Sequence, residues 1–118
     1  MKYMILIYGN EAENSKMSPE EGQKLMQAYM TYTAEVVKAG VMLAGAPLER
    51  IANATTVRVR NGKALTTDGP FAETKEQLGG FCLIDVASLD DALAWAAKCP
   101  GARYGSVEVR PLMSIPGT

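Results

Sequence analysis

Residues 3–8 read Tyr-Met-Ile-Leu-Ile-Tyr, an apolar or aromatic side chain at every position of a run that has the length of one β-strand. Successive side chains of a strand point to opposite faces of a sheet, so both faces of this strand need cover from water. The run is far shorter than the ~20 apolar residues of a membrane span. It therefore predicts a strand that is buried on both of its faces.

Two helices are expected after this strand. The first begins at the Ser18-Pro19-Glu20-Glu21 capping box and ends at Gly40, which suits a left-handed cap. Spacings of four, three and four predict its inner face as Leu25, Tyr29, Tyr32 and Val36. The second helix begins after Ser88 and ends near Cys99. Its inner face is expected to consist of Leu89, Leu93, Ala96 and Ala97.

Further strands are expected at 41–46, 81–86 and 106–110. Between the first two of these, alternation over 55–60, the turn-forming Asn61-Gly62 and a return strand at 64–67 predict a β-hairpin, followed by a loop over 68–78. With the hairpin set aside as an insertion, the order is β-α-β-β-α-β. That order is typical of a ferredoxin-like α+β fold, with two helices on one face of an antiparallel sheet.

The opposite face of the predicted sheet carries a mixture of large apolar and charged side chains. Alternation assigns to it Phe81, Leu83, Asp85, Ser106, Glu108 and Arg110. Two such faces packed together would bury the apolar residues and leave a cleft lined by Asp85, Glu108, Arg110 and Tyr8. We therefore expect a homodimer, a dimeric α+β barrel, with a cavity of ligand size.

Composition bounds the remaining possibilities. The 118 residues suit a single domain over 1–118, and 12 Lys+Arg against 13 Asp+Glu do not favour nucleic-acid binding. Without a signal peptide or a membrane span, a cytoplasmic location and no membrane partner are expected. Cys82 and Cys99 are expected to be buried and reduced. The absence of histidine removes imidazole-based catalysis, and neither a metal site nor a cofactor is expected.

The run Thr67-Asp68-Gly69-Pro70-Phe71-Ala72-Glu73-Thr74-Lys75-Glu76-Gln77-Leu78-Gly79-Gly80-Phe81 is similar to the signature of DGPF-domain proteins, a branch of the YCII-related family. The segments 2–9 and 105–111 resemble the same branch. The resemblance implies a dimeric α+β barrel. Genes of this family often lie beside those for extracytoplasmic-function sigma factors. Some YCII-like relatives have been discussed as enzymes that use a His–Asp pair, which a chain without histidine cannot supply.

The loop of this run is the candidate site. Asp68, Glu73 and Glu76 are the candidate acid/base groups, and a ligand would be held by Tyr8, Pro70, Phe71, Lys75, Gly79, Gly80 and Arg110. A structural explanation competes with this one, because Asp, Gly and Pro form turns and Phe71 could anchor the loop in the core. The charges could also belong to a solvated loop, and Gly79-Gly80 could serve close approach of a partner's backbone or of a ligand.

Two hypotheses on function follow. The first is a cofactor-free enzyme that carries out acid/base chemistry on a small organic molecule, with Lys75 or Arg110 holding an anionic group. The second is a module without turnover that senses a ligand or binds a partner, and that could serve a neighbouring sigma-factor regulator.

Overall fold

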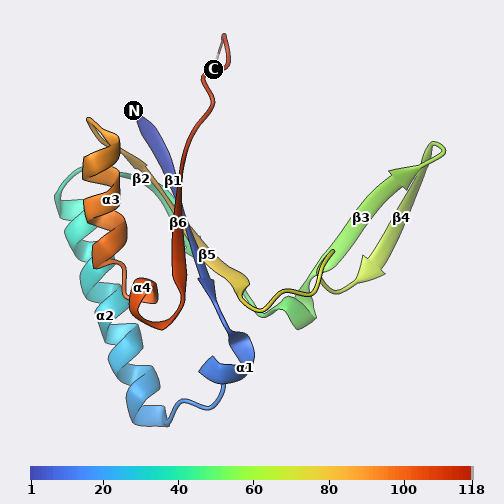
Figure 1. Ribbon diagram of the computed structural model, residues 1–118, viewed down its shortest axis with the longest axis horizontal. Helices are drawn as coiled ribbons and strands as arrows, with labels where there is room; N and C mark the ends of the chain where they lie inside the picture. The colour runs from blue at the N-terminus through green and yellow to red at the C-terminus, as the bar shows by residue number, and fades with distance from the viewer. Residues whose placement is uncertain (118) are drawn as a thin grey trace.

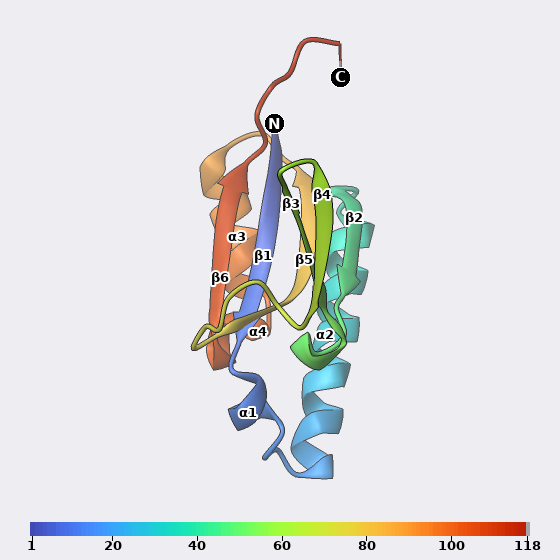
Figure 2. The ribbon, with the colours of Figure 1, turned by 90° about the vertical axis from the view of Figure 1, so that its right-hand side faces the viewer.

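Two long helices cover one face of a four-stranded antiparallel sheet, and a β-hairpin extends away from the opposite face (Figure 1). This is a computed structural model, and it describes residues 1–117. Viewed from the side of the hairpin, the sheet lies in front of the helices (Figure 2). The uncovered face of the sheet, called the open face below, is therefore on the same side as the hairpin.

The strands of the main sheet lie in the order β2-β5-β1-β6. They are β1 (Lys2–Gly9), β2 (Met42–Pro47), β5 (Gln77–Asp85) and β6 (Ser106–Pro111). The long helices are α2 (Pro19–Lys38) and α3 (Leu89–Lys98), and the short ones are α1 (Glu11–Asn14), the 3-10 helix η1 (Ile51–Asn53) and α4 (Gly101–Tyr104). The hairpin consists of β3 (Thr55–Arg60) and β4 (Lys63–Asp68) and is called the arm below. Without the arm and the short helices, the elements follow the predicted ferredoxin-like order β-α-β-β-α-β. The predicted fold class is therefore confirmed.

The core lies between the sheet and the two long helices. Ile5 of β1, Ile84 of β5 and Val36 of α2 have no exposed surface. Tyr3, Cys82 and Val86 complete the inner side of the sheet, as alternation predicted for the β5 residues. The hydroxyl of Tyr32 donates a hydrogen bond of 2.9 Å to the Trp95 carbonyl and so ties α2 to α3.

The ends of the helices follow the predicted capping chemistry. The Ser18 side chain accepts a hydrogen bond of 3.1 Å from the Glu21 backbone N–H, and that of Ser88 accepts one of 3.2 Å from Asp91. Gly40, after α2, has a φ of 73°, in the left-handed region that glycine adopts without strain. In the arm, Asn61 and Gly62 have φ values of 52° and 73°, as a tight hairpin turn requires.

Of the four residues predicted for the inner face of α3, Ala96 is buried and the other three are not. Ala92 and Ala96 are buried against the sheet, whereas Leu89, Leu93 and Ala97 are exposed. Burial follows the positions 92, 96 and 99, one helical stripe that consists of small side chains. Small side chains on the inner face let the helix lie close to the sheet. The larger Leu89 and Leu93 lie on the outer face, so side-chain size did not indicate which face is buried.

The boundary between the loop and β5 also differs from the prediction. β5 begins at Gln77 rather than at Phe81, so the expected loop over 68–78 is shorter. Ile7 pairs with Gly80 and Tyr8 with Leu78, which leaves Gly79 as the extra residue of a β-bulge. A bulge interrupts the alternation of side chains, and strand alternation alone therefore located the start of β5 too late.

Removing the Ile84 side chain should lower stability by about 2–5 kcal/mol, because Ile84→Ala leaves a cavity where no water enters. Chemical denaturation at one fixed protein concentration measures the change. Leu93→Ala is the control, since Leu93 is 47% exposed and its truncation should cost much less. Equal losses in the two variants would contradict the assignment of the core.

Candidate functional site

The open face carries an apolar centre with polar groups along β6. Its apolar members are Met4 and Leu6 of β1, which pair with Leu83 and Phe81 of β5. On the other side of β1, Leu6 pairs with Glu108 and Met4 with Arg110. Strand partners point to the same face of a sheet, so the predicted assignment of Phe81, Leu83, Glu108 and Arg110 to this face is correct.

Four polar side chains meet where β1 ends and β6 begins. The Tyr8 hydroxyl lies 3.4 Å from Glu108 Oε1 and can donate to it. The Ser106 hydroxyl donates a hydrogen bond of 2.7 Å to Glu76 Oε1. Tyr8 and Ser106 are strand partners, which brings the two hydrogen-bonded pairs together. Tyr8, Glu76, Ser106 and Glu108 are called the polar cluster below.

The segment 74–77 that delivers Glu76 to this cluster is held by side-chain hydrogen bonds. Thr74 Oγ1 donates to the Glu76 carbonyl at 2.6 Å, and Gln77 Nε2 donates to the Thr74 carbonyl at 2.6 Å. Gln77 Oε1 also accepts a hydrogen bond of 2.9 Å from the Glu11 backbone N–H. These bonds hold the backbone of the segment, and the Glu76 carboxylate lies beside β6 as a result.

A depression of about 660 Å³ lies on the other side of the same segment, at the base of the arm. It is lined by α1, η1 and the segment 74–77: Asn10, Glu11, Ala12, Arg50, Ile51, Ala52, Asn53, Thr74, Lys75 and Gln77. Arg50 Nε lies 3.7 Å from Glu11 Oε1, and the Ile51 N–H donates to Glu11 Oε2 at 3.1 Å. Arg50 is already paired with the Glu11 carboxylate. Lys75 is therefore the cation in this depression that is better able to bind an anionic group. The volume falls within the range of small-molecule sites.

The structure places some of the predicted site residues near the polar cluster and the others on the arm or on the exposed loop. Tyr8 and Glu76 belong to the polar cluster, Lys75 lines the neighbouring depression, and Arg110 lies on the open face two residues beyond Glu108. Asp68 pairs with Thr55 at the base of the arm instead. Pro70, Phe71 and Glu73 are exposed on the loop. Phe71 is 76% exposed, so the alternative that it anchors the loop in the core of its own chain is wrong.

The two glycines lie within the sheet. A Cβ on Gly80 would come within 3.2 Å of the Ala46 carbonyl oxygen, so the backbone that approaches it is strand β2 of the same chain. Gly79 is the bulge residue and is exposed. Close strand packing therefore explains Gly80 without any ligand.

Sequence reasoning missed several residues of the site. Ser106 was assigned to the open face, but nothing in the sequence linked it to Glu76, which is 30 positions away. Glu11 and Arg50 come together through α1 and η1, two short elements without a hydrophobic period. Asp85 was expected in the cleft, but its carboxylate lies 3.0 Å from the N-terminal ammonium of Met1.

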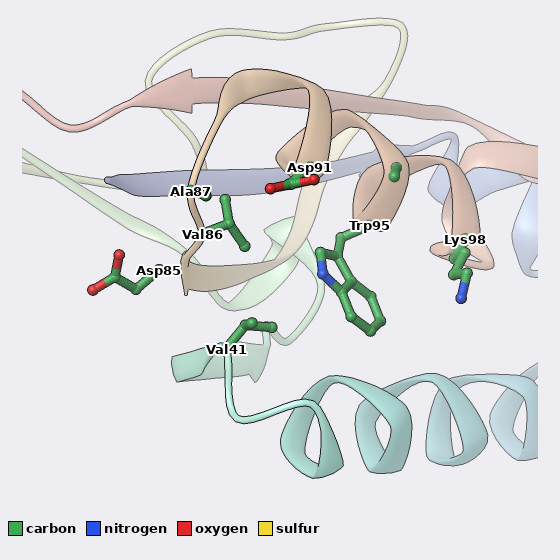
Figure 3. Close-up of a pocket in the computed structure, with 8 residues that line it drawn as sticks. Val41, Asp85, Val86, Ala87, Asp91, Trp95 and Lys98 are labelled. Carbon is green, nitrogen blue, oxygen red and sulfur yellow. The ribbon is translucent and has the colours of Figure 1, made fainter.

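A second hollow, of about 500 Å³, lies between α2 and α3 on the helix side (Figure 3). Val41, Val86 and Trp95 form its apolar wall, and Lys98 Nζ lies 5.1 Å from the centre of the Trp95 ring. The same ammonium is 3.9 Å from a Glu35 carboxylate oxygen. Asp85 and Asp91 also line the hollow, and Lys98 is already engaged by Glu35 of α2 and by the Trp95 ring.

The cysteines do not contribute a nucleophile to the polar cluster. Both are free and buried in the core, as expected. Burial raises the pKa of Cys82 and of Cys99, in the opposite direction from thiol activation. Burial likewise raises the pKa of Tyr29 and Tyr32 well above the ordinary value.

The fold and the open face define an α+β protein of the ferredoxin-like class. Residues 1–116 match the YCII-related domain, and the chain belongs to the YCII-related family. It is 44% identical over 114 residues to the uncharacterised protein R00369 of Rhizobium meliloti (strain 1021), covering 95% of this chain and 92% of that protein.

A solved structure gives the corresponding comparison of folds. The chain is similar to 5-chloro-2-hydroxyhydroquinone dehydrochlorinase (TftG) of Burkholderia phenoliruptrix AC1100 in complex with 2,5-dihydroxybenzoquinone. The TM-score is 0.55 at 13% identity, over 96% of this chain and 94% of the other. At this identity the likeness shows the fold. Within residues 1–117, none of the helices has the length and apolar character needed to cross a membrane.

Alkaline pH should destabilise the protein through the buried thiols. Unfolded thiols ionise near pH ~8.5, whereas burial raises the pKa of both in the folded chain. The contribution of the two protonated thiols to the free energy of unfolding is therefore complete below that pH. It is lost as the pH rises, by up to about 1.4 kcal/mol per pH unit for each thiol. Denaturation midpoints measured between pH 7 and 10 test this. Replacing both cysteines by Ala should make stability nearly independent of pH below pH ~10. Above that pH, unfolded tyrosines ionise while burial keeps Tyr29 and Tyr32 protonated in the folded chain, so stability falls again.

Proposed function

We propose that the open face binds a small organic molecule, with the polar cluster holding the polar end and the apolar centre of β1 and β5 contacting the rest. The supporting observation is the pair of carboxylates, Glu76 and Glu108, each with a hydroxyl group beside it at one end of an otherwise apolar face. Pockets for small molecules combine an apolar wall with a few convergent polar groups in this way.

A second copy of the chain completes this site. In a single chain, Met4, Leu6, Phe81 and Leu83 are each partly exposed and lie next to one another on adjacent strands. Contiguous apolar surface of this kind is typical of interaction sites. A second open face packed on the first removes these side chains from water and converts the polar cluster into the wall of a cleft.

The polar cluster has the groups for proton transfer. As proposed, Glu76 takes a proton from a hydroxyl or an acidic C–H group of the ligand, while Ser106 holds the carboxylate in place. Tyr8 donates a hydrogen bond to an oxygen on which negative charge develops, Arg110 stabilises that charge, and Glu76 then returns its proton to the ligand. Asp68, at the end of β4, and Glu73, on the exposed loop, are the alternative acid/base groups.

A non-catalytic role uses the same surface. In this second proposal the ligand is bound without conversion, and occupancy of the cleft reports to a partner, which could be a sigma-factor regulator. Ligand binding that never yields product under turnover conditions would decide for this role. Product formation would decide for the enzyme.

Binding should depend on the Glu76 carboxylate. The probe is 2,5-dihydroxybenzoquinone, the compound bound in the TftG structure, because its planar ring and ionisable hydroxyls suit an apolar wall with polar groups at one end. Loss of one charge-assisted hydrogen bond in Glu76→Gln should weaken binding about tenfold or more. Isothermal titration calorimetry and thermal shift measure the change.

Glu73→Gln is the matched control, since it makes the same chemical change three positions away on the exposed loop. It should bind as the wild type does and melt at the same temperature. Loss of binding in Glu73→Gln but not in Glu76→Gln would move the site to the loop. If the probe and a panel of related phenols and carboxylic acids all fail to bind the wild type, the small-molecule proposal is wrong.

A further inference from the structure

Within residues 1–117, the two strands of the arm pair in a sheet with each other and with no other strand. β3 and β4 form a two-stranded sheet of their own, separate from the main sheet. Its base is closed by a hydrogen bond of 2.7 Å from the Gly69 N–H to the Ala54 carbonyl and by one of 2.8 Å from Thr56 Oγ1 to the Gly69 carbonyl. Beyond Thr56, every residue through Asp68 is exposed. A hairpin of two strands is at best marginally stable in water, so an ordered arm calls for a surface that covers it.

The two faces of the arm differ in chemistry. On one face lie Val57 and Val59, 60% and 61% exposed, opposite Thr66 and Ala64. On the other face lie Arg58 and Arg60, with Lys63 opposite Arg60. One face thus offers exposed β-branched side chains, and the other offers three cations together with the exposed side chain of Leu65, which pairs with Arg58.

The charge of the arm is opposite to that of the rest of the chain. Residues 55–68 contain Arg58, Arg60 and Lys63 and one acidic residue, Asp68, which gives +2. The whole chain has 12 basic and 13 acidic residues, so the remainder has 9 and 12, or −3. The arm cannot use this complementarity within its own chain, because it points away from the body (Figure 1).

A second copy of the chain satisfies each of these conditions. The arm leaves the body on the side of the open face, where a second sheet would pack (Figure 2). In a two-fold symmetric pair, each basic arm meets the acidic body of the other copy, so one contact occurs twice. The single chain is also more extended than a compact domain, as expected if the arm packs on another chain. Its radius of gyration is 16.4 Å, against about 13–14 Å for a compact domain of this length.

We propose that the β3–β4 arm is a clasp that packs on the body of a second copy, with Val57 and Val59 as apolar contacts and Arg58, Arg60 and Lys63 as its electrostatic guide. The clasp goes beyond the ligand-binding proposal and does not depend on it, since it concerns assembly in the absence of any small molecule. It also places the exposed loop 69–73, at the base of the arm, beside the interface.

Charge reversal on the arm tests the clasp. Arg58→Glu/Arg60→Glu should weaken dimerisation at least tenfold at low salt, measured by sedimentation equilibrium of the full chain without ligand. The matched control is Lys24→Glu/Lys38→Glu on α2, which changes the net charge by the same amount. The control should dimerise as the wild type does. The difference between the variants should shrink at 1 M salt, where exposed charges are screened within ~3 Å.

Limited trypsin digestion distinguishes the clasp from a dimer made by the open faces alone. Trypsin cleaves after Arg58, Arg60 and Lys63, so cleavage of the arm should slow as the protein concentration rises through the dimerisation range. Val57→Ser/Val59→Ser, which replaces only exposed side chains of the single chain, should remove this protection and leave the melting of the monomer unchanged.

Three results would overturn the clasp. The first is a chain that stays monomeric at tens of micromolar. The second is a dimer whose arm is cleaved at the same rate at every concentration. The third is an arm that is protected by duplex DNA and not by the protein itself. A dimer that clasps normally but binds no small molecule would instead leave the clasp intact and count against the ligand-binding proposal.

Discussion

The pairing of β1 with both β5 and β6 is the constraint on which the rest of the molecule depends. It places the first and last strands side by side and turns Ile5 toward the helices and Leu6 toward the open face. Both sides of β1 therefore carry apolar side chains, and the helices cover only one of them. The same pairing sets Tyr8 opposite Ser106, and the bulge at Gly79 lets β5 begin early enough to bring Glu76 alongside. The core and the polar cluster are thus products of one register.

The polar cluster and the arm divide two tasks between distinct parts of the chain. Groups that could handle a proton are held by the sheet and by the hydrogen-bonded segment 74–77, where their geometry changes little. Exposed apolar and basic groups lie on the arm, which is joined to the sheet through the loops around η1 and residues 69–76. In these two proposals, a second copy closes the space around a ligand bound at the polar cluster, and the arm holds that copy in place.

Patterns of short period were sufficient to predict the architecture. The strand at 3–8, the Ser18 and Ser88 caps and the Asn61-Gly62 turn each depend on neighbouring residues, and the structure confirms all of them. In the single chain only the helix side of that strand is buried, and Met4 and Leu6 on the other side are partly exposed. The helix α3 was predicted correctly, but most of its inner face was not, because both faces of that helix carry apolar residues and residue size could not show which face turns inward. The site was harder still, since the bond between Ser106 and Glu76 spans 30 positions and the contact of Glu11 with Arg50 passes through short helices without a period.

The closed base of the arm has a consequence for how this family can diversify. Because the Ala54 carbonyl and the Gly69 N–H meet at 2.7 Å, the chain leaves the body and returns to it at nearly the same point. Residues can be added, removed or exchanged between those two points without shifting any strand of the main sheet. Under the proposed clasp, changes confined to the arm would alter which copies recognise one another while the body of the fold stays the same.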